Sequence, residues 1–464
     1  MSFPPSFRFV RARVSASGND TRICNVEVRD GVIASINAPA TAALPEIDLA
    51  GLWLLPGAID GHVHFDDPGF THREDFASGT IAASAGGVTT IVDMPCTSLP
   101  PVVDGKAFRS KLAIVAPKAR VDFAFWGGAR GNAFDPEAIE TSLRELAACG
   151  VRSIKTYLVS GMETFEALDA DALEHVLRVA ASLDVMVGVH AEDSAMIAQA
   201  TAREGSGGND TPDAYLRIRS VEAEAAGVAT CVRLAEKTRA RVHVVHLACG
   251  EGVQAIRQAQ ARGVTITAET CPHYLQFTSN DLSRLGSVLK TAPVVKSQAD
   301  QDALWEGLAD GTIAMIATDH APGRWPEEKC TGSFSRDYGG VPGVELMMPF
   351  VLSHGVARGR LSLERALELM CAGPARVHHL EGKGALRVGN DADLVVFDPA
   401  ERWTVRAAEL WTRQKYSPFE GVEFQGRVRH TFVRGKHVFD IARGPVGEPS
   451  GRMAVAQPCY PRPS

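Results

Sequence analysis

The sequence predicts an α/β fold: a (β/α)₈ TIM barrel with a small β-sandwich domain built from the N- and C-terminal segments. Two observations lead to this prediction. Short apolar runs rich in Val, Ile and Thr alternate with helical stretches through the middle of the chain, whereas both ends have only short strand-like runs separated by turn residues. The length of 464 residues suits one large barrel with a smaller companion domain.

Eight apolar runs define the expected barrel strands. They cover residues 54–65, 89–95, 121–127, 151–157, 185–192, 241–248, 265–273 and 312–321. Between them lie stretches in which apolar residues recur with the period of a helix, such as residues 171–182, 220–237 and 298–308. Because strand and helix alternate in this way, we assign residues 55–384 to the barrel.

The two chain ends are expected to form the second domain together. Their strand-like runs cover residues 7–14, 23–36, 46–53, 393–397, 403–405 and 427–439. Arg29-Asp30-Gly31 and Arg434-Gly435 are typical of hairpin turns. We therefore assign residues 1–54 and 385–464 to a β-sandwich, the second segment ending in a proline-rich tail.

Composition and charge exclude several classes of protein. The net charge of -7, without a long basic run, argues against a nucleic-acid partner. No apolar stretch is long enough to span a membrane, and the first ten residues lack the apolar core of a signal peptide. Nine cysteines without a paired spacing favour reduced thiols. We therefore expect a cytoplasmic protein.

Polar side chains gather at the expected carboxyl ends of the barrel strands, where catalytic groups of this fold lie. His62 and His64 are two residues apart, so on a strand both imidazoles point to the same side. Four other runs bring Lys155, His190, His246 and Asp319. A structural histidine, a capping aspartate or a snorkelling lysine explains each residue singly, but their joint placement on five strands predicts a metal site.

Motifs along the whole barrel resemble those of the cyclic amidohydrolases, namely dihydroorotase, allantoinase, hydantoinase and dihydropyrimidinase. The matching segments are PGAIDGHVHF, GGVTTIVDMP, IKTY, VHAED, VHLACGEG, ETCPHYL, ATDHAP, GGVPGVE and GALRVGNDADLVVFDP. This resemblance implies a metal-dependent hydrolase that opens a C–N bond in a cyclic amide. Family members often form dimers or tetramers, so it also implies a homo-oligomer.

The resemblance implies a site with two divalent metal ions, and it assigns the ligands residue by residue. One ion is held by His62, His64 and Asp319, the other by His190 and His246. An ammonium group has no lone pair to offer, so Lys155 is expected to bridge the ions as a carbamate. Imidazole and oxygen ligands suit Zn²⁺. Asp319 is the expected catalytic residue, which moves a proton from the nucleophile to the leaving nitrogen.

The substrate is predicted from what the pocket lacks. Dihydroorotases hold a substrate carboxylate with Arg, Asn and His at positions that are Asp66, Cys96 and Gly323 here. An aspartate cannot replace an arginine as partner of a carboxylate. The segments HVHFDDPG, VDFAFWGG and QKYSPFEGVEFQGRVRHTFVRGK are more similar to allantoinases. We therefore favour an allantoinase-like enzyme acting on a neutral cyclic ureide.

Six residues are expected to contact the substrate: Asp66, Cys96, Tyr157, His273, Gly323 and Gly343. Hydantoinases place an oxyanion-binding Tyr a few residues beyond the bridging Lys; Tyr157 lies close to that place, although Val159, Ser160 and Gly161 occupy the positions beyond. The roles of His72, Glu74 and Trp126 stay open.

Other interpretations remain at this point. One is a dihydroorotase with an altered carboxylate site, in which Arg73, Arg130 or Lys329 supplies the positive charge. Others are a hydantoinase, a dihydropyrimidinase or a cyclic imidase. A non-catalytic scaffold relative is disfavoured because all six metal-binding positions are present. A deaminase of the wider superfamily is disfavoured by Lys155, because those enzymes usually have one metal and no bridging lysine.

Overall fold

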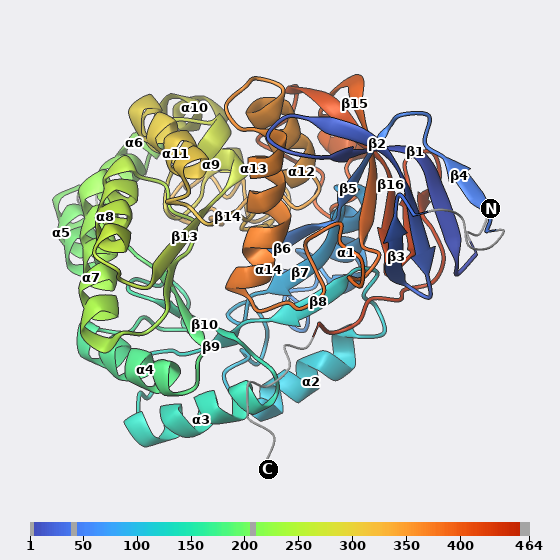
Figure 1. The fold of residues 1–464 in the computed structure, drawn as a ribbon. Helices are drawn as coiled ribbons and strands as arrows, with labels where there is room; N and C mark the ends of the chain where they lie inside the picture. The colour runs from blue at the N-terminus through green and yellow to red at the C-terminus, as the bar shows by residue number, and fades with distance from the viewer. Residues whose placement is uncertain (1–3, 39–43, 205–209, 455–464) are drawn as a thin grey trace, which may run out of the picture.

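A computed structural model describes residues 4–38, 44–204 and 210–454, and within them it shows the two expected parts (Figure 1). Parallel strands surrounded by helices form the barrel, and a sheet made from both chain ends lies beside it. The last ten residues of the expected proline-rich tail lie outside the described residues. No helix of the described ranges is long and apolar enough to cross a membrane.

The barrel strands are all parallel and buried. They are β6 (Ala58–Val63), β7 (Val88–Asp93), β8 (Asp122–Phe125), β9 (Gly127–Gly128), β10 (Ser153–Tyr157), β11 (Met186–His190), β12 (Val242–Val244), β13 (Ile266–Thr270) and β14 (Met315–Ile316). The third barrel strand is split at Trp126, since β8 pairs with β7 and β9 pairs with β10. A parallel bridge between Val63 and His320 closes the ring.

Trp126 explains the split. Its indole nitrogen donates a hydrogen bond to the Gly61 carbonyl oxygen, 2.8 Å away. A Cβ atom added at Gly188 would lie 2.5 Å from its ring. The Trp126 side chain therefore fills the barrel interior between strands that are not neighbours, which makes it a core residue.

The helices follow the strands as the periodicity predicts. Those that follow barrel strands are α1 (Phe76–Ala85), α2 (Gly105–Val115), α3 (Pro136–Ala148), α4 (Ala170–Ser182), α7 (Val221–Thr238), α8 (Gly250–Ala261) and α11 (Gln298–Asp310). The shorter ones are α5 (Ser194–Glu204), α6 (Pro212–Ile218), α9 (Pro272–Gln276), α10 (Ser279–Leu285), α12 (Met347–Phe350), α13 (Leu363–Leu367) and α14 (Gly373–Val377). Side-chain caps begin most of the long helices; Asp169, for example, accepts from the Ala172 amide ahead of α4.

The terminal sheet is one continuous nine-stranded sheet. Its strands are β1 (Phe7–Ser15), β2 (Thr21–Arg29), β3 (Val32–Ile36), β4 (Glu46–Asp48), β5 (Trp53–Pro56), β15 (Leu394–Thr404), β16 (Glu423–Val433), β17 (Lys436–Asp440) and β18 (Gly444–Pro445). β5 pairs with β1 on one side and β15 on the other, and so joins the two chain ends. The rings of Phe7 and Phe9 lie 5.9 and 5.3 Å from that of Phe432, so the two halves share one core.

Both predicted hairpin turns are present, because both central residues of each turn have positive φ. Asp30 and Gly31 have φ values of 48° and 87°, and Arg434 and Gly435 have 45° and 69°. This is the requirement of a type I′ turn. The domain boundaries at residues 54/55 and 384/385 stay a prediction.

Candidate metal centre and active site

Three side chains from opposite ends of the barrel segment meet at the closure of the ring. His62 is the second-last residue of β6 and His64 follows this strand, while Asp319 follows β14. The Asp319 Oδ1 atom lies 3.1 Å from His62 Nε2 and 3.2 Å from His64 Nε2. The ligand atoms of these three residues all lie within 4.8 Å of one another, as the ligands of a single ion must.

The other two histidines extend this cluster. His190 ends β11, and its Nδ1 atom lies 3.1 Å from Nε2 of His246, which follows β12. The rings of His62 and His246 are 5.4 Å apart. The four imidazoles therefore form one continuous row along the carboxyl ends of the strands, in the place that the sequence predicts.

Lys155 on β10 is fully buried, and its Nζ atom has no hydrogen-bond partner among the described residues. Nζ lies 4.4 Å from the centroid of the Tyr157 ring, whose own centroid is 5.3 Å from that of His190. Burial lowers the pKa of Lys155 to about 8. A buried, unpartnered amine beside unpaired imidazole nitrogens such as His246 Nδ1 fits a site completed by metal ions and a carbamate.

Two carboxylates behind the cluster orient the histidines, and sequence reasoning missed both. Glu269 on β13 bonds to Nδ1 of His62 and, at 3.2 Å, to Nε2 of His243. Glu192 bonds at 2.7 Å to Nε2 of His190. Such partners fix which ring nitrogen faces a metal. Each is a carboxylate inside an otherwise apolar run of the sequence, and Glu192 lies two residues after His190. This pattern could have identified them.

Backbone strain gathers at the same rim. His246, Asp319 and Asp66 have φ values of 40°, 49° and 54°, in the left-handed region that non-glycine residues rarely adopt. Residues keep such conformations only where their surroundings hold them, and these cluster at functional sites.

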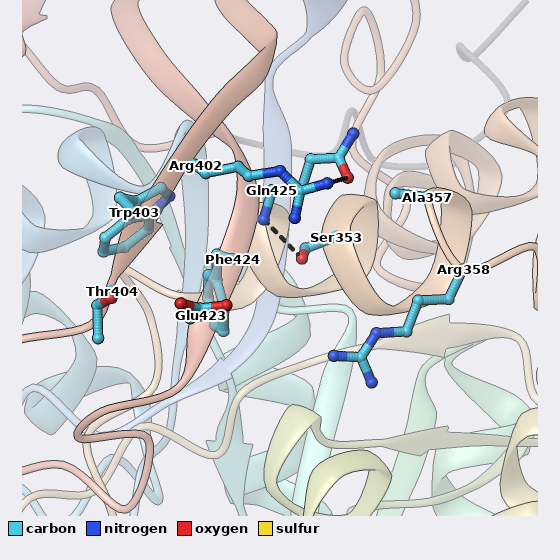
Figure 2. A pocket seen from close by; sticks show the side chains of 9 residues that line it. All are labelled: Ser353, Ala357, Arg358, Arg402, Trp403, Thr404, Glu423, Phe424 and Gln425. Carbon is cyan, nitrogen blue, oxygen red and sulfur yellow. Dashed lines mark hydrogen bonds between the residues drawn. The ribbon is translucent and has the colours of Figure 1, made fainter.

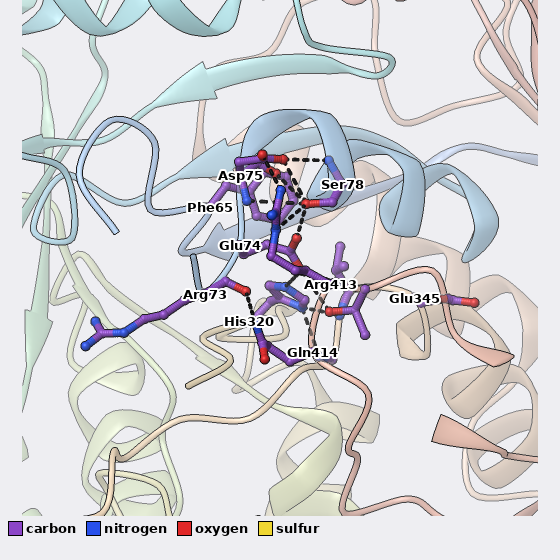
Figure 3. Close-up of polar contacts among 12 residues, drawn as sticks. Phe65, Arg73, Glu74, Asp75, Ser78, His320, Glu345, Arg413 and Gln414 are labelled. Carbon is purple, nitrogen blue, oxygen red and sulfur yellow. Dashed lines mark hydrogen bonds and ion pairs between the residues drawn. The ribbon is translucent and has the colours of Figure 1, made fainter. Parts of the chain in front are cut away.

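The backbone after Asp319 is held by a buried network around His320 (Figure 3). The Nδ1 atom of His320 accepts from the amides of Gly343 and Val344 at 3.1 and 3.2 Å, so Nε2 donates to Glu74 at 3.3 Å. Glu74 also accepts from the Thr412 hydroxyl at 2.8 Å. His320 and Glu74 thus have a structural role, and Arg73 points away from them (Figure 3).

A cavity of about 270 Å³ opens over the metal-competent residues. Its wall includes His62, His64, His190, His246, Asp319 and, among the residues expected to contact substrate, Tyr157. The wall also includes Thr97, Met162, Arg219, Tyr338 and Gly340.

The other five residues expected at the substrate lie behind this wall. Asp66 is buried with an unpaired carboxylate, and Cys96 contacts the Tyr157 hydroxyl at 3.2 Å. His273 is buried beside Tyr274. The Gly323 amide donates to Tyr416, and the Gly343 amide to His320. Burial raises the pKa of Asp66 to about 7.

The cations considered for a substrate carboxylate are engaged elsewhere. Arg73 forms two hydrogen bonds of 2.8 Å with Glu328. Lys329 donates to the carbonyl oxygens of Tyr338 and Gly340, and Arg130 to that of Thr164. Arg219 does line the cavity, but it is paired with Glu192. It precedes α7, outside any strand end, and no sequence signal singles it out.

A second cavity, of about 330 Å³, lies on the terminal sheet against the turn of helix at Val351–Val356 (Figure 2). Its wall includes the exposed Arg358 and Arg402, and the Gln425 amide donates to the Ser353 hydroxyl there. None of the metal-competent barrel residues lines it. The cavity at the barrel rim is therefore the candidate active site.

Comparison with known proteins agrees with this geometry. Residues 53–438 match the amidohydrolase family. The chain belongs to the amidohydrolase family. The resemblance predicted from the motifs and the assignment as a hydrolase are thereby confirmed.

Allantoinases from Rubrobacter xylanophilus and Streptomyces avermitilis are similar to this chain, 39% identical over 437 residues and 38% identical over 444 residues. The matches cover 94% of this chain in both cases, and 94% and 96% of the relatives.

Solved structures of a hydantoinase and a dihydropyrimidinase show the same fold. L-Hydantoinase (dihydropyrimidinase) from Arthrobacter aurescens has a TM-score of 0.91 at 30% identity, with 98% of this chain and 100% of that one covered. Dihydropyrimidinase from Brevibacillus agri has a TM-score of 0.91 at 28% identity, with 99% and 100% covered. The predicted combination of a barrel with a β-rich domain from both termini is confirmed.

Proposed function

We propose that this chain is an allantoinase-like hydrolase that opens a neutral cyclic ureide at a site with two metal ions. The observation that carries the proposal is the row of four histidines and Asp319 along one wall of the rim cavity, together with the buried Lys155 amine, which has no hydrogen-bond partner among the described residues. Full-length similarity to proteins named allantoinases supports the choice of allantoin as substrate.

The residues divide into two metal-binding halves. His62, His64 and Asp319 would hold one ion, His190 and His246 the other, and carbamylated Lys155 would bridge them. The imidazole and oxygen donors suit Zn²⁺. When bound, the two ions would lower the pKa of a shared water and polarise the ring carbonyl.

Asp319 is the proposed proton carrier. Its Oδ1 atom faces two histidines and its carboxylate lines the cavity, so it would be in reach of a nucleophilic water held there. It would accept the proton from that water and deliver it to the ring nitrogen as the C–N bond breaks. The strained backbone and the His320 network hold it in place.

The pocket favours a neutral ring over an acidic one. Arg219 is the one lysine- or arginine-type cation among the wall residues in the described part of the chain, and its charge is already matched by Glu192. A substrate carboxylate would have to compete with a buried carboxylate for that guanidinium, which costs free energy.

The test is a hydrolysis assay of enzyme supplied with Zn²⁺ and bicarbonate. The substrates are allantoin, hydantoin, dihydrouracil, succinimide and dihydroorotate. We expect the highest kcat/KM for allantoin and none measurable for dihydroorotate. Turnover of dihydroorotate alone would refute the neutral-ring argument, and no turnover of any ring by fully metallated enzyme would favour the scaffold alternative.

A further inference from the structure

Two histidines and an aspartate meet a second time in the terminal sheet, on the β16–β17 hairpin. His430 on β16 and His437 and Asp440 on β17 place one ligand atom each within 4.8 Å of the others. His430 Nδ1 lies 3.3 Å from His437 Nε2 and 3.7 Å from Asp440 Oδ2. We propose that this hairpin binds a divalent cation of the zinc type.

A bulge in the hairpin creates the cluster. His437 and Asp440 are three residues apart, so in a regular strand they would point to opposite faces. Here Thr431 pairs with Phe439 and Phe432 with His437, which leaves Val438 as an extra residue. The bulge therefore turns His437 to the face that bears His430 and Asp440.

The separations suit an ion. A tetrahedral ion bound at zinc–nitrogen distances of 2.0–2.1 Å holds two imidazole nitrogens about 3.3 Å apart. The two nitrogens of the hairpin have this spacing. Asp440 Oδ1 accepts from the Ala442 amide at 2.9 Å, which leaves Oδ2 directed to His430.

The surroundings favour a fixed site. The ring of His437 stacks on Phe432 with centroids 4.9 Å apart, and Phe432 belongs to the core shared by both halves of the sheet. The neighbouring cation Arg429 is paired with Asp398 and Glu401 at 2.9 and 2.5 Å. Three protein ligands with two neutral imidazoles and one carboxylate leave a fourth position for water.

The comparison with a third cluster shows why charge alone does not define a site. Asp122, Asp391 and Asp393 also lie together, but Lys383 Nζ is 2.5, 2.7 and 2.8 Å from them. That cluster already contains its cation. On the hairpin, the ion-pair partner of Asp440 is His430, which is itself one of the three ligands.

The test is a titration of metal-free, untagged protein with Co²⁺, which reports tetrahedral coordination by its visible absorption, followed by zinc analysis. We expect the double variant His430→Asn/His437→Asn to bind one equivalent fewer than wild type, with unchanged kcat. The control His175→Asn alters a histidine on α4 outside both clusters and should bind the wild-type number.

Two further variants separate the hairpin site from the barrel site. Asp440→Asn, which preserves side-chain volume, should weaken the hairpin site at least about tenfold. His62→Ala/His64→Ala should lose metal at the barrel and keep the hairpin equivalent, so failure of the barrel proposal is distinguishable. Equal metal content and affinity in wild type and both hairpin variants would overturn the inference.

Discussion

At the scale of single residues, the buried amine of Lys155 gives the sharpest prediction. Replacing Lys155 with Ala removes the only candidate bridge between the two metal halves of the described site. We expect fewer than two ions bound at the barrel rim and a fall in kcat/KM of more than about 100-fold, because groups that only support a ligand already cost 10–100-fold. Metal analysis and the ring-opening assay measure both. An active variant with both ions would refute the bridging role.

A second prediction at this scale concerns pH. Glu224 is buried, with its Oε1 accepting from the Ala248 amide at 2.7 Å and Lys296 Nζ 3.6 Å from Oε2. Burial, opposed by Lys296, raises the pKa of Glu224 from 4.5 to about 7. Between these values the folded state binds the proton and the unfolded state does not, so this group lowers stability as pH rises.

Glu224→Gln should therefore weaken the loss of stability between pH 5 and pH 7, by up to about 1.4 kcal/mol per pH unit. Urea unfolding of metal-saturated wild type and variant at both pH values measures it. Identical pH dependence in the two proteins would show that Glu224 is ionised throughout.

The predictability of the site differed from residue to residue for physical reasons. The positions of His62 and His64 followed from the two-residue period of a strand. Arg219 could not be found, because it reaches the cavity from the segment before α7. Asp66 and Gly323 occupy the family's substrate positions in sequence, yet lie behind the wall. Asp66 has a left-handed backbone that redirects its side chain, and the Gly323 backbone amide donates to the Tyr416 hydroxyl.

At the scale of secondary-structure elements, one glycine decides how closely α7 approaches the active site. A Cβ atom at Gly227 would lie 2.4 Å from the Ala191 carbonyl carbon and 2.7 Å from the Glu192 nitrogen, directly after His190. Gly227→Ala should lower stability by about 1–3 kcal/mol through overpacking, although alanine favours a helix by about 1 kcal/mol.

Unfolding in urea measures the stability lost in Gly227→Ala. We also expect His190 to shift enough in this variant to weaken metal binding. The matched control is Gly263→Ala, at a turn where an added Cβ meets nothing within 4 Å but φ is +83°. That variant should show a strain cost without any change in metal affinity. Wild-type stability and affinity in Gly227→Ala would contradict the close packing.

Strand boundaries show what the apolar pattern alone cannot resolve. The expected run 54–65 is two strands, β5 in the terminal sheet and β6 in the barrel. Both strands are apolar, so they can be distinguished only by the strands with which they pair. At the break, a Cβ on Gly57 would lie 2.1 Å from Thr89 Oγ1. Run 312–321 contains only Met315–Ile316 as a strand, because the following residues turn to present Asp319.

At the scale of the whole molecule, Glu74 ties the C-terminal part of the chain to the barrel (Figure 3). It accepts from His320, the Thr412 hydroxyl and the Arg413 amide. All three donors reach the same carboxylate oxygen, so Glu74→Gln replaces a charged acceptor with a neutral amide oxygen, and we expect a loss of about 1–3 kcal/mol in the free energy of unfolding.

The matched control is Glu306→Gln on the exposed side of α11, which should change stability by less than about 0.5 kcal/mol. Equal unfolding midpoints for Glu74→Gln and wild type would show that the network adds no stability.

The overall architecture was the most predictable level, because strand and helix alternate with distinct periods through the barrel. That the terminal strands form one continuous sheet was not predictable, since β5 must pair with strands from both ends of the chain. The dimer or tetramer and the cytoplasmic location remain predictions, and light scattering on the purified protein measures the first.

The most direct test of the metal centre is a crystal structure grown with Zn²⁺ and bicarbonate, with anomalous diffraction at the zinc edge. We expect two zinc peaks at the barrel rim, one beside His62, His64 and Asp319 and one beside His190 and His246. Added density on Lys155 Nζ should lie between them. A single peak at the rim, or two peaks around an unmodified Lys155, would contradict the bridged two-metal site.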